Sequence, residues 1–215
     1  MNSLTKNIQS EETLLSLIHR AFPDAFCTGI EELTEGYLGS KFSYPGQPAL
    51  QGDNWHQVFA LMTGLAFSDG ERLSIDLKIS REQLFKDLDE SKVIFDEVKV
   101  PSLVHWDLWD GNIFVKDNRI TGLIDWERSL WADPLMEVGF RTYGTDRDFY
   151  KGYGIDRLSE KEYLRALWYD VYTMLLVSQE CDYRQYETRD MYDWASGHLA
   201  DKFNELHRAL HSMSL

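Results

Sequence analysis

The sequence predicts an α+β fold in which a mostly helical domain carries one short β-hairpin. Apolar residues recur at helical spacing over long stretches on both sides of the centre of the chain. Near the centre, the apolar runs 113–115 and 120–124 flank Asp117-Asn118, a turn-forming pair, which is typical of a hairpin with a bulge at Gly122. A chain of 215 residues can bury one sizeable core, or one domain with a small appendage.

Composition and charge limit the class of protein. A formal net charge of −14 argues against nucleic acid or an anionic membrane as the main partner. Cys27 and Cys181 are the only cysteines, and such a pair gives neither a disulfide framework nor a zinc-binding spacing. The longest apolar run, 58–67, is interrupted by Thr63 and Gly64 and is too short to span a bilayer. With no signal-peptide pattern at the N-terminus, the sequence predicts a cytoplasmic protein.

The first 42 residues predict one helix and one strand. Ser10 is a helix cap followed by acidic residues and an apolar face, and Pro23 ends this helix. The stretch 27–34 favours a strand, and Gly36 and Gly39 follow it as turn residues.

The rest of the chain predicts several helices around the hairpin. The first begins after Asn54 and presents one apolar face made of Trp55, Val58, Phe59, Met62 and Leu65. Capping-box pairs, Ser80 with Gln83 and Ser159 with Glu162, begin two more helices. The first of these two runs through Leu84, Leu88 and Phe95. Asp133-Pro134 begins a short helix, and a last helix runs through Trp194, Leu199, Phe203, Leu206 and Leu210.

Polar side chains stand where the central strands end. His105, Asp107 and Asn112 precede the hairpin, and Asp125 follows it, 18 positions after Asp107. Carboxylate and amide oxygens gathered at strand ends can hold a hard cation such as Mg²⁺, whose coordination shell phosphate oxygens usually complete. The alternative is a buried polar turn in which Asp107 and Asn112 cap backbone amides.

These residues carry a resemblance. The spacing His105-x-Asp107-x-x-x-x-Asn112 matches the catalytic loop of protein kinases except that Trp106 stands where they have arginine. The segments H-W-D-L-W-D-G-N, I-D-W-E and A-D-P resemble the catalytic core of the aminoglycoside phosphotransferase family, small-molecule kinases related to protein kinases. The resemblance extends from about residue 43 to the end, and is tightest over 103–140. It implies a kinase-like C-terminal lobe that contains a small catalytic hairpin.

The resemblance also implies roles for individual residues. Asp107 would accept the proton of the substrate hydroxyl, and Asn112 and Asp125 would hold Mg²⁺ against the phosphates of ATP or another nucleoside triphosphate. His105 would orient the loop. Asp110 would contact the metal or cap the turn, and the turn is the preferred interpretation. Glu127 and Asp133 match family positions beyond the metal site, where we expect a scaffold role.

In one respect the sequence departs from the family. A kinase-like chain continues through several strands, a lysine that binds the phosphates and a helix that carries its glutamate partner. Here the segments that resemble the start of the larger lobe, 43–47 and 52–55, follow almost at once, and Lys78 lies beyond them in an expected loop. About 16 residues, 27–42, hold two strands at most. We therefore expect residues 1–42 to be a remnant of a truncated N-terminal lobe and 43–215 to be the kinase-like lobe.

Two classes of function follow from these expectations. The chain is an ATP- and Mg²⁺-dependent phosphotransferase acting on a small-molecule hydroxyl, or it is a catalytically impaired binding or regulatory protein without a complete ATP site. A metal-dependent hydrolase is a more distant alternative. An exposed lobe face, apolar in part, predicts self-association as a homodimer.

The sequence does not identify the acceptor of the phosphate group. A cationic acceptor would suit the acidic residues of the C-terminal helices, although such residues more commonly form a solvated face. They are Asp170, Glu180, Asp182, Glu187, Asp190 and Asp193. Aminoglycosides, choline-like amines and sugars all remain open.

Overall fold

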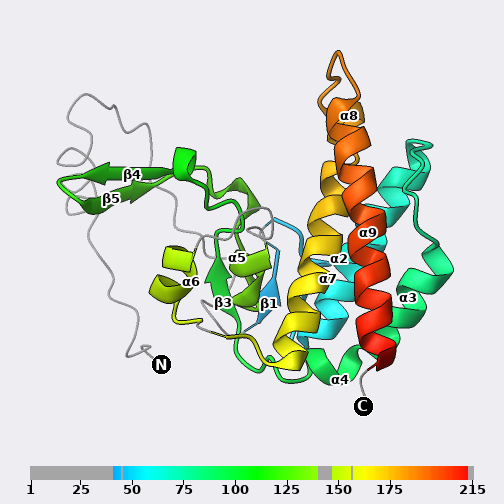
Figure 1. Cartoon of the computed structure of the whole chain (residues 1–215), viewed down its shortest axis with the longest axis horizontal. Helices are drawn as coiled ribbons and strands as arrows, with labels where there is room; N and C mark the ends of the chain where they lie inside the picture. The colour runs from blue at the N-terminus through cyan, green and yellow to red at the C-terminus, as the bar shows by residue number, and fades with distance from the viewer. Residues whose placement is uncertain (1–40, 45, 140–146, 156, 213–215) are drawn as a thin grey trace.

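The computed structural model describes residues 41–44, 46–139, 147–155 and 157–212, and it confirms the α+β class (Figure 1). The expected N-terminal helix and strand lie outside these residues. The helices are α2 (Trp55–Arg72), α3 (Arg81–Glu90), α4 (Lys92–Phe95), α5 (Leu135–Gly139), α6 (Arg147–Tyr153), α7 (Glu160–Val177), α8 (Glu180–Tyr183) and α9 (Asp190–Ser212). The strands are β1 (Phe42–Ser43), β2 (Gln51–Gly52), β3 (Ser102–Val104), β4 (Ile113–Lys116), β5 (Arg119–Leu123) and β6 (Leu130–Ala132), with single 3₁₀ turns at Asp110–Asn112 and Trp126–Arg128.

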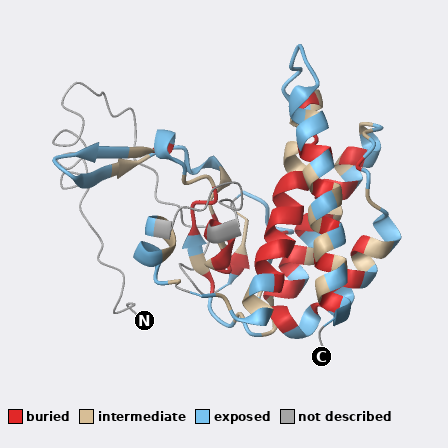
Figure 2. Ribbon diagram, viewed as in Figure 1, coloured by how far each residue is buried: buried red, intermediate tan, exposed pale blue. Residues whose placement is uncertain are grey.

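Helix α7 is the centre of the core. It lies among α2, α9 and the sheet, and buried residues occupy most of its length (Figure 2). Its aromatic side chains meet those of α2 and α4: the ring of Phe59 lies 5.2–5.5 Å, between centroids, from the rings of Phe95, Tyr169 and Tyr172. Each such buried side chain contributes roughly 1.5–3 kcal/mol of transfer free energy. The helices around α7 therefore form the packed core against which the rest of the described chain is positioned.

A four-stranded antiparallel sheet joins segments that are distant in sequence. Its order is β2-β1-β6-β3, so β6 lies between β1 and β3. Trp131 of β6 pairs with Ser43 of β1 on one side and with Leu103 of β3 on the other. Because β3 leads directly to His105 and β6 follows Asp125, this pairing brings the two halves of the predicted motif toward each other.

The expected hairpin is present as β4 and β5. Asp117 and Asn118 form its turn, both with positive φ (52° and 58°), as a tight two-residue hairpin loop requires. The register shifts because Phe114 pairs with Gly122 and Val115 pairs with Ile120, which leaves Thr121 as the extra residue, next to the expected bulge position. The hairpin extends away from the core, and most of its residues are exposed (Figure 2).

Two details of the helices differ from expectation. Leu65 is exposed, because the buried face of α2 continues from Met62 to Ala66, one residue further around the helix. The helix expected through Leu84, Leu88 and Phe95 is two helices, since α3 ends at Glu90 and Ser91 begins α4. The capping box of Ser159 and Glu162 is confirmed in both directions.

Within the described residues, no helix is long and apolar enough to cross a membrane.

Candidate active site

The loop that follows β3 is held by one buried carboxylate. Glu137 of α5 accepts a hydrogen bond from the backbone amide of His105 (2.8 Å) and another from the amide of Trp106 (2.9 Å). Both donors and Glu137 itself are buried. Because a buried amide without an acceptor costs about 1–3 kcal/mol, this contact determines the path of the chain into Asp107.

Trp106 adopts a backbone conformation that a bulky residue rarely takes. Its φ is +60°, a region that costs roughly 1–3 kcal/mol for a residue other than glycine. Its indole is buried and stacks on Tyr172 of α7, with ring centroids 5.3 Å apart and an angle of 17° between the planes. The packed indole and the two amide contacts to Glu137 together stabilise this strained turn, which leads directly into Asp107.

Asn112 joins the end of the loop to Asp107. Its side-chain Nδ2 donates to the backbone carbonyl of Asp107 (2.8 Å) and lies 3.5 Å from the carboxylate Oδ2 of the same residue. Since the two amide atoms diverge from one carbon, Oδ1 of Asn112 points away from that carbonyl. The side chain is buried, so its orientation is well determined by its surroundings.

Ile124 connects the hairpin exit to the same loop. Its amide donates to the carbonyl of Asn112 (3.1 Å), and its carbonyl lies 2.8 Å from Nε2 of buried His105, which donates to it. Asp125 is the next residue, in a left-handed conformation (φ 64°, ψ 54°) and exposed to solvent. Asp125 therefore leaves the hairpin beside the loop that carries Asp107 and Asn112.

The pKa of Asp107 reports its electrostatic surroundings. Burial raises this pKa above its ordinary value, the positive charge of Arg128 opposes the rise, and the negative charge of Asp125 adds to it. Arg128 donates a hydrogen bond to Glu180 of α8 (2.7 Å). Asp107, Asp125 and Arg128 are thus close enough to influence one another's charge.

The donor set fits Mg²⁺. The Asn112 amide oxygen and the Asp125 carboxylate are hard oxygen donors, which Mg²⁺ prefers, and an exposed carboxylate leaves room for phosphate and water ligands. His105 is not part of this set, because its two ring nitrogens lie against the Ile124 carbonyl and the Asp107 amide (3.3 Å).

The supporting residues lie in different environments. Asp110 is exposed at the start of the first 3₁₀ turn, and Glu127 is exposed with Arg184 at 3.9 Å. Asp133 is buried, where its Oδ2 accepts from Nε of Arg165 (2.9 Å) and from the hydroxyl of Tyr169 (2.6 Å). Asp133 therefore links the segment after β6 to α7, as a scaffold residue would.

The acidic residues of the C-terminal helices do not share one environment. Buried Asp170 lines a cavity of about 360 Å³ between α6, α7 and α9, with Lys202 at 4.0 Å. Glu180 binds Arg128 beside Asp107, and Asp182 pairs with Arg189 (3.2 Å). Lys78 lies in the loop between α2 and α3, as expected.

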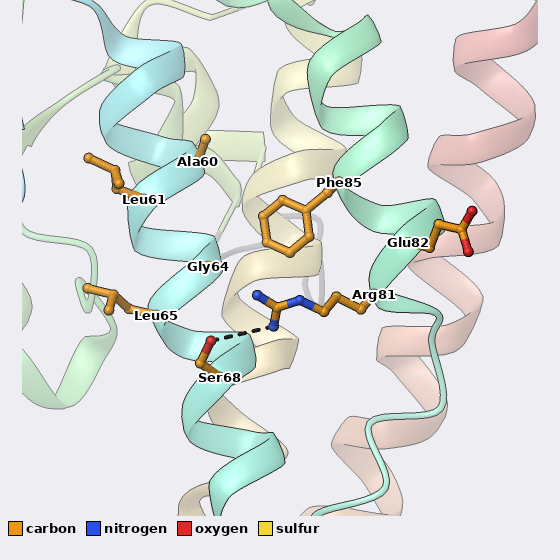
Figure 3. A pocket seen from close by; sticks show the side chains of 8 residues that line it. All are labelled: Ala60, Leu61, Gly64, Leu65, Ser68, Arg81, Glu82 and Phe85. Carbon is orange, nitrogen blue, oxygen red and sulfur yellow. Dashed lines mark hydrogen bonds between the residues drawn. The ribbon is translucent and has the colours of Figure 1, made fainter.

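A second cavity, of about 770 Å³, is separate from the predicted site. It is an open groove between α2 and α3, where Figure 3 shows Leu61 and Leu65 on one side and Phe85 and Arg81 on the other. The guanidinium of Arg81 lies over the Phe85 ring, 5.1 Å from its centroid. None of the predicted site residues lines this groove.

Comparison with known proteins identifies the family. The model of the phosphotransferase enzyme family, APH, matches residues 40–167, which is more than half of the chain. The chain belongs to this family. No curated protein sequence matches it significantly.

Solved structures of phosphotransferases match part of this chain at low sequence identity. A thermostable mutant of aminoglycoside phosphotransferase APH(4)-Ia in complex with AMP-PNP and hygromycin B is 20% identical, with a TM-score of 0.48 over 74% of this chain and 54% of that one. Its apo form is 22% identical, with a TM-score of 0.44 over 74% and 54%. Spectinomycin phosphotransferase APH(9)-Ia with ADP and spectinomycin is 15% identical, with a TM-score of 0.35 over 70% and 48%. The chain spans about half the length of these structures.

Two residues of this candidate site, Glu137 and Arg128, were not predicted from the sequence. Glu137 stands four residues after Asp133, so both lie near the start of one short helix, and this spacing was the available signal. Arg128 follows Asp125 by three positions, and it is the first basic residue after the motif. From their positions in the sequence alone, one cannot tell that Glu137 accepts from the loop amides or that the charge of Arg128 acts on Asp107.

Proposed function

We propose that this chain is an ATP- and Mg²⁺-dependent phosphotransferase that transfers phosphate to a hydroxyl group of a small molecule. The observation that carries the proposal is the double contact of Ile124, to Asn112 and to His105, which joins the hairpin exit to the loop of Asp107. Phosphoryl transfer depends mainly on positioning and on neutralising charge. This arrangement would supply the positioning, and a metal ion held by it would supply the neutralising charge.

In this proposal Asp107 accepts the proton of the acceptor hydroxyl. Its raised pKa makes it a better proton acceptor than an ordinary aspartate, while the positive charge of Arg128 opposes the rise and favours the ionised carboxylate. The hydrogen bonds of Asn112 and Glu137 hold the backbone on both sides of this carboxylate.

Asn112, through Oδ1, and Asp125 would hold Mg²⁺. When bound, the ion would neutralise the negative charge of the nucleotide phosphates. Asp125 directly follows Ile124, and the contact of the Ile124 amide with the Asn112 carbonyl supports placing Asp125 beside Asn112. His105 is a positioning residue, because its ring binds a backbone carbonyl and is buried.

The division of the chain is part of the proposal. Residues 43–215 would form the kinase-like lobe and residues 1–42 a small N-terminal unit. The pairing of Ser43 with Trp131 supports placing the lobe boundary here. The acceptor would be a small molecule, and a cationic one would suit the net charge of −14.

The test is turnover of ATP by the purified full chain in the presence of Mg²⁺, preceded by a calorimetric titration with ATP and Mg²⁺. We expect Asp107→Asn to lower the rate about 10²- to 10⁴-fold, because a general base contributes that much. The matched control is Asp110→Asn, which removes an exposed carboxylate of the same loop and should leave the rate nearly unchanged.

Each other outcome selects an alternative. Absence of Mg²⁺-dependent ATP binding would favour a lobe that binds or regulates without catalysis. Release of phosphate from a phosphorylated substrate without ATP would favour a metal-dependent hydrolase that uses the same carboxylates.

A further inference from the structure

A group of metal-ligating side chains lies between α3 and α9, on elements that do not contribute to the predicted active site. Asp87 comes from α3, and His207 and His211 come from α9. One ligand atom from each residue lies within 4.8 Å of the ligand atoms of the other two. The helices lie next to each other at the right-hand side of Figure 1.

The spacing of these residues on each helix lets their side chains face one common point. His207 and His211 are four residues apart, so both side chains lie on one face of α9. Asp87 and Glu90 are three residues apart on α3, and Glu90 also faces this group, with Oε2 3.5 Å from Nε2 of His211. Two imidazoles from one helix thus oppose two carboxylates from another.

The ring of His211 is oriented for metal binding. Its Nδ1 lies 2.9 Å from the backbone carbonyl of His207, and a carbonyl only accepts, so Nδ1 carries the hydrogen in this contact. In the neutral ring, Nε2 then keeps its lone pair and points toward Glu90. Metal-binding histidines characteristically donate their second ring nitrogen to a carbonyl or carboxylate in this way.

Asp87 is a rigid anionic ligand. Its side chain is fully buried, Oδ1 accepts from Nε2 of Gln83 (2.7 Å), and Oδ2 lies 2.7 Å from Nδ1 of His207. The Gln83 contact fixes the carboxylate plane and leaves Oδ2 directed at the histidines. A cation placed against Oδ2 would therefore meet His207 with little rearrangement of α3.

We propose that Asp87, His207 and His211 bind a divalent transition metal of the Zn²⁺ class, with Glu90 as the fourth ligand. Zn²⁺ takes four ligands at about 2.0–2.2 Å from nitrogen and oxygen donors. The 2.7 Å contact between Asp87 and His207 would widen by about 0.6 Å, toward the ~3.3 Å between two donors of a tetrahedral site, as the metal takes the place of the shared proton. The metal would cross-link the C-terminal helix to α3.

The experiment uses the full chain after treatment with EDTA. Co²⁺ is titrated in millimolar Mg²⁺, which occupies oxygen-only sites, and the visible absorption of Co²⁺ reports four-coordinate binding; Zn²⁺ then displaces it. We expect one equivalent per chain and a rise in melting temperature with Zn²⁺. His211→Ala, which truncates a side chain 43% exposed, should weaken binding at least about tenfold and abolish the rise.

The matched control is His198→Ala, which removes another histidine of α9 outside the group and should bind like the original chain. Glu90→Gln, also at the surface, should retain binding with reduced affinity. Equal Co²⁺ affinity in the original chain and in His211→Ala, or no binding by either, would overturn the proposal. The cluster would then be a hydrogen-bonded contact between α3 and α9.

Discussion

The two halves of the candidate active site are built in different ways. The loop of Asp107 is embedded in the helical lobe, where Glu137, Tyr172 and His105 are buried and hold it through hydrogen bonds and ring stacking. The hairpin that leads to Asp125 is almost entirely exposed, with Val115 at 62% and Ile120 at 67% of full exposure. It keeps its shape through local turn chemistry and its own strand pairing.

The two halves of the site are therefore held in position by different kinds of contact. The proposed base is positioned by contacts with residues about 30 to 65 positions away in sequence, so it depends on the whole core. The position of Asp125, one of the two proposed metal ligands, depends on the hairpin, whose exposed residues can be substituted without disturbing the core. Only the two backbone contacts of Ile124 join the halves among the hydrogen bonds described above.

The largest loss of stability is expected when the buried ion pair of Asp133 and Arg165 is broken. Asp133→Asn removes the charge opposite Arg165, whose side chain is 7% exposed, and should lower the free energy of unfolding by about 3–5 kcal/mol. Urea denaturation measures this loss. Asp69→Asn, which breaks an exposed pair with Arg72, should leave the urea midpoint unchanged; equal effects would mean that burial does not distinguish these pairs.

A smaller loss of stability is expected when Glu137, which holds the loop before Asp107, is changed. In Glu137→Gln only one oxygen remains to accept from the amides of His105 and Trp106, so one buried donor loses its acceptor, at a cost of about 1–3 kcal/mol. The rate of phosphate transfer should fall as well, because the loop that carries Asp107 shifts. Glu127→Gln, at an exposed position, serves as control. A Glu137→Gln chain as stable as the original would show that the amides are not held by this carboxylate.

The electrostatic link between the halves can be tested through pH dependence. Arg128 lowers the pKa of Asp107, so Arg128→Met should raise that pKa further. Since the base acts when ionised, the acidic limb of the pH profile of kcat/KM should move to higher pH. Arg184→Met removes an exposed arginine that faces Glu127 and should not move the limb. A movement to lower pH would contradict the assignment of Asp107 as the base.

The smallest effect is expected in the hairpin. Val115→Thr, at an exposed position, should change the free energy of unfolding by no more than about 0.5 kcal/mol. The same substitution at fully buried Val104 of β3 places a hydroxyl in the core and should cost about 1–3 kcal/mol. Thermal denaturation of the two variants compares the halves directly, and similar losses would indicate that the hairpin packs against the rest of the protein.

Features that depend on neighbours in sequence were predictable. The hairpin turn at Asp117-Asn118 and the capping box of Ser159 with Glu162 involve residues within four positions, so their geometry follows from the local sequence. The family, too, could be inferred, from the resemblance of the segment around His105, Asp107 and Asn112 to its catalytic core. The face of α2 was predicted correctly to Met62 and failed at Leu65, where both residues 65 and 66 satisfy the helical period and only packing selects Ala66.

By itself, the sequence determined the fold class, the hairpin and the family motif, because each rests on periodicity or on spacing over a few residues. Only the tertiary structure decided which distant groups complete them. Glu137 accepts from the amides of His105 and Trp106, and Arg128 binds Glu180 while its charge acts on Asp107. Asp87 meets His207 across 120 positions. Such pairs form because packing of the core brings their elements together, and no local pattern records which side chains will then face each other.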